Sequence, residues 1–131
     1  MSTVGKHMST QIFSTNPDKF AYEAIDDMYK NGVSALLVKK KGEYIGIITK
    51  TDWMLLVLRG ECDPKKVKTS SVMTRIKSTI DENKTIAEAC TIMEERKIRH
   101  LPVTQAGKIL GMFSVKDLEK YFLQLHQKTD F

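Results

Sequence analysis

Two short stretches carry the residues best suited to chemistry, and both follow one pattern. Each has a glycine, two apolar residues, a hydroxyl, two spacers and an aspartate: GIITKTD at residues 46–52 and GMFSVKD at residues 111–117. A hydroxyl three residues before an aspartate is typical of a helix start, where the two side chains cap free N–H groups. The same pair suits a ligand, because a helix N-terminus attracts phosphate and a carboxylate accepts hydrogen bonds from a ribose diol. Both interpretations stay open from the motif alone.

The two motifs belong to a longer internal repeat. The offset between Asp52 and Asp117 is 65 residues, and this offset aligns nearly the whole chain without a gap. The identical pairs include Met8 and Met73, Lys19 and Lys84, Met28 and Met93, Leu36 and Leu101, and Gly42 and Gly107. Two such copies account for essentially all 131 residues. Because a copy of about 60 residues buries too little surface to be stable alone, we expect the two to complete one core.

Each copy predicts the order helix–strand–strand–helix. In the first copy, apolar residues at helical spacing predict a helix over residues 20–30, which Gly32 ends. Strands follow at residues 34–40 and 44–49, and the short turn between them favours antiparallel pairing. A second helix begins near residue 50. The second copy predicts a helix over residues 85–96, strands over 99–104 and 109–114, and a helix from 115 to about 126.

The remaining segments connect and precede the copies. Residues 60–68 are polar and contain a proline, which predicts a linker between units at residues 1–59 and 69–131. The stretches VGKHMST at residues 4–10 and TSSVMTR at residues 69–75 precede the two copies. Each is expected to form a helical turn and an extended strand that cap the copy they precede.

Composition and charge narrow the class of protein. Hydrophobic residues make up 41% and charged residues 28%, as in soluble globular proteins. No apolar run is long enough to span a membrane, and the start of the chain has no signal-peptide core, so we expect a cytoplasmic protein. The net charge of +5 favours anionic partners without choosing among nucleotides, nucleic acid and acidic surfaces.

Catalysis and metal binding find no support in the sequence. Cys62 and Cys90 lack CxxC spacing and are expected to be free thiols, and the three histidines lie far apart. No Ser-His-Asp or Cys-His arrangement is readable, and no paired carboxylates flank a glycine-rich loop. We therefore expect neither an enzyme nor a required metal or cofactor.

The order and spacing of the motifs, in both copies, resemble a tandem pair of CBS domains, the regulatory modules named after cystathionine beta-synthase and also called a Bateman module. The resembling stretches are VMT at 72–74, TIAEACTIM at 85–93, IRHLPV at 98–103 and GMFSVKD at 111–117, with HMS, FAYEAIDDM, VSALLV and GIITKTD in the first copy. This resemblance implies an α+β fold whose two units pack through their sheets with pseudo-two-fold symmetry. It also implies a homodimer and a regulatory role.

The resemblance further implies a regulatory ligand that contains adenosine, such as AMP, ADP, ATP, NAD or S-adenosylmethionine, in clefts between the units. In the family the hydroxyl and aspartate take the ribose and phosphate, and basic residues just before the first strand of a copy contact phosphate, as Arg99 and His100 would here. The nucleotide-binding residues carried over are Thr49, Asp52, Ser114, Asp117, Arg99, His100, Val33, Ser34, Ile98, Lys50 and Lys116. His100 would be charged only below its ordinary pKa of about 6.5. Lys19 and Lys84 take a cleft-edge position by the same resemblance.

The two sites are not expected to be equal, and two other functions stay open. The first copy has Leu37 where the family usually has proline, and Ser34 and Ala35 where the second copy has Arg99 and His100. One alternative is a dimerisation or protein-interaction module without a physiological nucleotide. Another is nucleic-acid binding, although a recognition helix, RNP-like aromatics and a zinc finger are all missing from the sequence. A sensor would act through a partner protein that the sequence does not identify.

Overall fold

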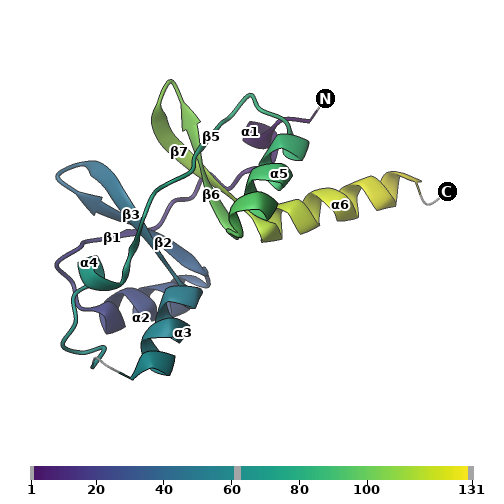
Figure 1. Cartoon of the computed structure of the whole chain (residues 1–131). Coiled ribbons are helices and arrows are strands. Elements are labelled where there is room, and N and C mark those ends of the chain that lie inside the picture. The colour runs from purple at the N-terminus through teal and green to yellow at the C-terminus, as the bar shows by residue number, and fades with distance from the viewer. Residues whose placement is uncertain (1, 61–62, 130–131) are drawn as a thin grey trace. The chain divides into compact units, whose positions relative to one another are not determined.

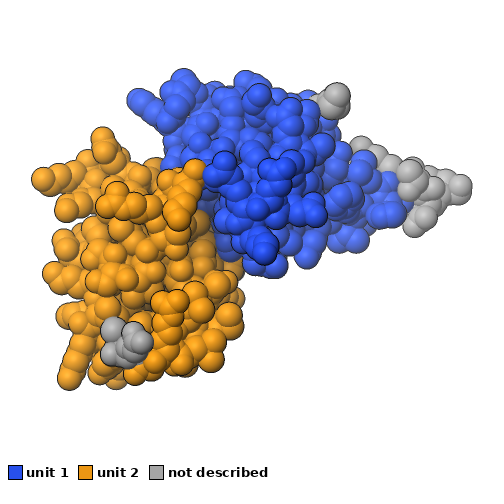
Figure 2. All heavy atoms as spheres, in the orientation of Figure 1, with its two compact units in different colours: residues 1–12, 78–131 blue, residues 13–77 orange. Residues whose placement is uncertain are grey.

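The computed structural model describes residues 2–60 and 63–129, and the chain divides into two compact units (Figures 1 and 2). Unit 1, blue in Figure 2, comprises Met1–Ile12 and Ser78–Phe131, and unit 2, orange, comprises Phe13–Lys77. Each unit contains one sheet together with helices. The α+β class expected from the sequence is confirmed.

Unit 2 is built around a four-stranded sheet in the order β1-β2-β3-β4. Its elements are β1 (Ser14–Thr15), α2 (Ala21–Asn31), β2 (Ala35–Lys40), β3 (Glu43–Thr49), α3 (Lys50–Arg59), α4 (Thr69–Val72) and β4 (Thr74–Arg75). Strand β1 pairs with β2 in parallel, and the other pairs are antiparallel. The predicted helix–strand–strand–helix order is present, with short edge strands added at both sides of the sheet.

Unit 1 repeats this plan with a three-stranded sheet in the order β5-β6-β7. Its elements are α1 (Val4–His7), β5 (Ile80–Asp81), α5 (Ile86–Arg96), β6 (His100–Gln105), β7 (Lys108–Ser114) and α6 (Val115–Thr129). Ser9 forms an isolated bridge with Met112, at the position along β7 that β4 takes along β3. The sequence repeat therefore extends to the outermost pairing of each sheet.

The tight turns between paired strands follow the predicted hairpin. Lys41 and Gly42 have φ values of 50° and 81°, and Ala106 and Gly107 have 50° and 80°. Two successive residues with positive φ match the right-handed twist of the strands that they join. The antiparallel pairing of β2 with β3 and of β6 with β7 is thus set by the turn.

The leading helices are exchanged between the copies, which differs from the sequence expectation that each would cap the copy it precedes. Val4 is fully buried in the core of unit 1, and its N–H donates to the carbonyl of Lys84 at 2.8 Å. In the same way, the N–H of Thr69 in α4 donates to the carbonyl of Lys19 in unit 2 at 2.7 Å. The two compact units of the structure therefore have different boundaries along the chain from the two sequence repeats.

The linker does more than connect, because its backbone caps a helix. Phe20 precedes α2 and offers no side-chain cap, whereas Thr85 caps α5 through a bond from the Glu88 N–H at 3.1 Å. The free N–H groups of Ala21 and Tyr22 instead donate to linker carbonyls, of Val67 at 2.8 Å and of Pro64 at 3.2 Å. The described part of the predicted linker thus satisfies the start of α2.

The glycine of each motif lies in the middle of a strand rather than at its end. A Cβ atom on Gly46 would lie 2.6 Å from the sulfur of Met73 and 3.0 Å from the carbonyl oxygen of Thr74. A Cβ atom on Gly111 would lie 2.5 Å from the sulfur of Met8 and 2.9 Å from the carbonyl oxygen of Ser9. These glycines are required because the exchanged leading segment crosses the strand at close range.

We expect Gly111→Ala to destabilise the protein by about 1–3 kcal/mol, because the added methyl overlaps a side chain and a carbonyl. Urea unfolding measures this change. Combining it with Met8→Ala should cost less than the sum of the two single changes, since the shortened side chain removes one overlap. Lys108→Ala, an exposed change on the same strand, is the control. A Gly111→Ala protein as stable as this control would contradict the packing role.

Candidate functional site

The hydroxyl and aspartate of each motif form a reciprocal cap at the start of a helix. The Thr49 N–H donates to Oδ2 of Asp52 at 2.8 Å, and the Asp52 N–H donates to the Thr49 hydroxyl at 3.3 Å. Ser114 and Asp117 repeat the arrangement at 2.8 and 3.4 Å. The capping interpretation is therefore confirmed in both copies. It accounts for only one oxygen of each carboxylate.

The second carboxylate oxygen distinguishes the two copies. Oδ1 of Asp52 accepts a hydrogen bond from the hydroxyl of Thr74 at 3.2 Å. Thr74 comes from β4, and the equivalent position on the leading segment of unit 1 is Ser9. Within residues 2–60 and 63–129, neither the Ser9 side chain nor Oδ1 of Asp117 takes part in a hydrogen bond. Asp117 thus keeps an open acceptor, whereas both oxygens of Asp52 are engaged.

Sequence reasoning missed the role of Thr74. The 65-residue offset aligns Thr74 with Ser9, and both hydroxyls were visible in the stretches VMT and HMS. The exchange of the leading segments brings Thr74 to Asp52, and helix and strand periodicity carries no information about that exchange. The contact is therefore a tertiary feature that only the structure supplies.

Strand pairing brings the two basic candidate residues, Arg99 and His100, next to the second motif. His100 pairs with Ser114 across β6 and β7, and the N–H of Val115 donates to the carbonyl of Arg99 at 3.0 Å. Arg99 is exposed and forms no ion pair with any residue that the structure describes. Asp117 is half-buried beside them. Four of the candidate residues thus gather at the N-terminus of α6.

The pKa of His100 is lower than the ordinary value of about 6.5 that was assumed from the sequence. Burial of the imidazole lowers the pKa of His100 from its ordinary 6.5, and the positive charge of Arg99 lowers this pKa further. The carboxylate of Asp117 opposes the shift without reversing it. His100 is therefore neutral at pH 7, and the positive charge beside Asp117 comes from Arg99.

The first motif has an equivalent backbone frame with different side chains. The N–H of Lys50 donates to the carbonyl of Ser34 at 3.1 Å, and Ala35 pairs with Thr49 across β2 and β3. Val33 and Ile98, two of the nucleotide-binding residues implied by the resemblance, are half-buried and pack against the cores of their own units. Lys50 and Lys116 are exposed in the first turns of α3 and α6.

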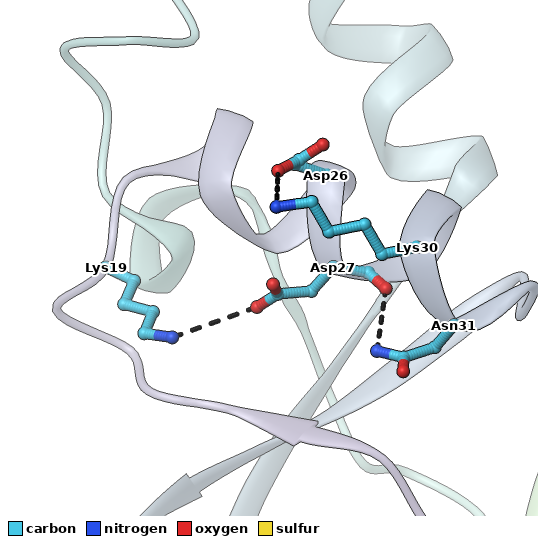
Figure 3. A network of polar contacts seen from close by, with 5 residues as sticks. All are labelled: Lys19, Asp26, Asp27, Lys30 and Asn31. Carbon is cyan, nitrogen blue, oxygen red and sulfur yellow. Dashed lines mark hydrogen bonds and ion pairs between the residues drawn. The ribbon is translucent and has the colours of Figure 1, made fainter.

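Lys19 and Lys84 are paired with acidic side chains of neighbouring helices. The amino group of Lys19 lies 3.8 Å from Oδ2 of Asp27, and that of Lys84 lies 3.9 Å from Oε2 of Glu88. Figure 3 shows Lys19 extended toward Asp27, whose backbone carbonyl also accepts a 2.8 Å bond from the side-chain amide of Asn31. These exposed pairs contribute little to stability. They also offset the charge that a cleft-edge lysine would offer a phosphate.

The described residues also bear on the expectations for metal binding, the two cysteines and membrane spans. Among residues 2–60 and 63–129, no three His, Cys, Asp or Glu side chains gather in a way that suits a metal ion. Cys90 is a free thiol whose pKa is raised by burial, and Cys62 lies outside the described residues. In the described part of the chain, every helix is too short or too polar to cross a bilayer.

Known sequences resemble the chain over most of its length. Residues 4–59 and residues 69–124 each match the model of the CBS domain family. The uncharacterized protein MK0525 of Methanopyrus kandleri is 29% identical over 118 residues, which are 88% of this chain and 60% of that protein. Inosine-5'-monophosphate dehydrogenase of Staphylococcus haemolyticus is 33% identical over 125 residues, which are 92% of this chain but only 24% of the enzyme.

Solved structures share the fold. A protein with CBS domains from Burkholderia ambifaria has a TM-score of 0.89 at 29% identity, and the match covers 94% of this chain and 95% of that one. The CBS domain pair of MJ0100 has a TM-score of 0.83 at 20% identity, with 93% and 96% covered. That pair was solved in complex with 5'-methylthioadenosine and S-adenosyl-L-methionine.

We expect the free energy of unfolding to fall as the pH drops below about 6.5, in part because unfolded His100 takes up a proton that the folded protein resists. The contribution of His100 is fully present above 6.5 and is lost as the pH falls through its lower, folded pKa. Urea unfolding between pH 5 and 8 measures this slope, which His100→Gln should reduce. His126→Gln, an exposed change, is the matched control. An unchanged slope in His100→Gln would show that folding leaves this pKa at its ordinary value.

Proposed function

Because the chain belongs to the CBS-domain family and carries two of these domains in tandem, we propose that it is a regulatory module that binds an adenosine-containing nucleotide. The ligand acts as a signal and undergoes no reaction. The adenosine-containing ligands of a solved CBS pair support this choice of ligand class. Differences between the two motifs support Asp117, rather than Asp52, as the carboxylate that binds it.

One observation carries this proposal: the carboxylate of Asp117 caps α6 with Oδ2 while Oδ1 accepts no hydrogen bond from the described residues. A ribose hydroxyl that donates to Oδ1 would leave the helix cap intact. Asp52 has no equivalent open oxygen, because the hydroxyl of Thr74 already donates to its Oδ1. The proposal therefore assigns a ligand to one motif and a structural role to the other.

The charges near Asp117 suit a phosphate. The N-terminus of α6 carries the positive end of the helix dipole, which favours an anion, while the N–H groups of Val115 and Asp117 are already bonded to Arg99 and Ser114. The exposed guanidinium of Arg99 adds forked donors and a positive charge. Lys116 adds a flexible charge one residue before Asp117. In the first copy, the 65-residue offset places Ser34 at the position of Arg99, Val33 at that of Ile98 and Thr51 at that of Lys116, while Lys50 aligns with Val115.

Regulation follows if the ligand binds one arrangement of the protein more tightly than another. A nucleotide that prefers one state shifts the population toward that state, by no more than its difference in affinity for the two. A partner protein would then recognise the favoured state. The module would be a sensor, and any catalysis would be carried out by the partner protein that it regulates.

We expect AMP, ADP, ATP, NAD or S-adenosylmethionine to raise the melting temperature of the protein. At about 100 times its Kd, a ligand of the folded state adds roughly 2.7 kcal/mol of stability. Asp117→Asn should remove this increase, because the amide is a poorer acceptor and carries no charge. Asp52→Asn is the matched control: it loses a similar cap but should keep the nucleotide response.

Either of two results would contradict this proposal. One is the absence of stabilisation by any of the five nucleotides, which would favour an interaction module. The other is an equal loss of response in Asp52→Asn and Asp117→Asn. Arg99→Ala provides a further check, because it should weaken phosphate-bearing ligands more than an uncharged adenosine. A salt-dependent affinity for DNA or RNA would favour the nucleic-acid alternative.

We also propose that the module forms a homodimer through the outer faces of its second helices. Met54, Val57 and Leu58 on α3 are 53%, 56% and 73% exposed, and Phe122 and Leu123 on α6 are 49% and 61% exposed. Exposed apolar side chains that cluster along one helix mark interaction surfaces, and a helix that packs against the same helix of a second copy suits a two-fold dimer. A solved CBS-CP12 protein that shares the fold is described as hexameric.

Light scattering at several protein concentrations tests the homodimer. We expect twice the monomer mass for the unaltered chain and the monomer mass for Leu58→Lys combined with Leu123→Lys. The exposed change Glu119→Lys adds the same kind of charge to the polar part of α6 and should leave the dimer intact. A monomeric unaltered protein, or a dimer that survives the double change, would rule out this interface.

A further inference from the structure

We propose that a groove beside α3 in unit 2 binds a small carboxylic acid with an apolar body, independently of the nucleotide proposed above. The groove has a volume of about 410 Å³, which is within the range of small-molecule sites. Its apolar walls are Leu55, Leu56, Val67 and Val72. Arg59 lies at one end and Asp52 at the other.

The groove follows one face of a helix. Asp52, Leu56 and Arg59 lie four and three residues apart on α3, so they form a single stripe together with Leu55. Seven residues of helix separate the two charged ends by about 10 Å. The opposite wall comes from Val67 before α4 and Val72 at its end. The result is an apolar channel as long as a medium-length alkyl chain or a substituted aromatic ring.

The charges at the two ends differ in availability. The carboxylate of Asp52 is engaged by Thr49 through Oδ2 and by Thr74 through Oδ1. Arg59 is exposed and pairs with no acidic side chain among residues 2–60 and 63–129. The available charge in the groove is therefore the guanidinium, whose forked donors match a carboxylate. An anion at Arg59 with its apolar body against the leucines satisfies both features.

Unit 1 fills the corresponding place differently. The 65-residue offset aligns Leu56 with Tyr121, Val72 with His7, and Arg59 with Gln124. The rings of His7 and Tyr121 pack edge to face with their centroids 4.8 Å apart. Where unit 1 has two rings in contact and a neutral amide, unit 2 has two aliphatic side chains and a cation. This divergence within a repeat favours a separate role for the groove.

Calorimetric titration with octanoate tests the proposal, with octanol and octylamine as analogues of equal length. We expect saturable binding of octanoate and at least tenfold weaker binding of the other two. Arg59→Gln, which places the residue of unit 1 at this position, should weaken octanoate about tenfold through the loss of a charge-assisted pair. Arg75→Gln is the matched control on a nearby exposed arginine and should leave the affinity unchanged.

A second variant tests the groove itself. Leu56→Tyr combined with Val72→His copies the ring pair of unit 1, so octanoate binding should disappear while the melting temperature stays close to that of the unaltered protein. Any nucleotide response at Asp117 should persist in this variant and in Arg59→Gln, so failure of the groove is distinguishable from failure of the nucleotide site. Equal affinity for octanol and octanoate, or full affinity in Arg59→Gln, would overturn the proposal. Octanoate that binds only dissociated protein would also overturn it, by showing that a second copy covers the groove.

Discussion

The close crossing of an exchanged leading segment over a glycine is the contact on which the other features depend. Met73 and the backbone of Thr74 lie against Gly46, and Met8 and Ser9 lie against Gly111. Any side chain at the glycine would push this segment away from the strand. The crossing places the hydroxyl of Thr74 on a carboxylate of the first motif, and it carries α4 to the side of α3, where the groove lies. One steric constraint therefore sets both the motif environment and the groove.

The two copies share the same backbone fold but differ in the side chains that contact the motif. Both copies build the same helix cap from a hydroxyl and an aspartate, with closely similar distances. They differ in the residues that the exchanged segments deliver, which are Thr74 in unit 2 and Ser9 in unit 1. Because the cap uses one oxygen of the aspartate, the state of the other oxygen decides whether the motif is only structural. The second carboxylate oxygen is thus engaged in the first motif and accepts no hydrogen bond from the described residues in the second.

Much of the fold was predictable from the sequence, and the limits have physical causes. Helical spacing, tight-turn glycines and the gapless offset predicted the main helices and strands, because these depend on local periodicity and turn geometry. The exchange of the leading segments was not predictable, since Val4 and its counterpart Thr69 precede the same pattern in both copies. The lowered pKa of His100 depends on burial that no spacing reveals. For the candidate site, the cap was predictable and the contact between Thr74 and Asp52 was not.

The two motifs share a helix cap, and we propose that only the second binds nucleotide. A titration followed by ¹⁵N NMR tests it most directly, because the backbone amides of the two motifs report separately. We expect saturable shifts for the amides of Ser114, Lys116 and Asp117, while those of Thr49 and Asp52 stay in place. Shifts of equal size and affinity at both motifs would contradict the assigned difference. Shifts confined to Thr49 and Asp52 would reverse it.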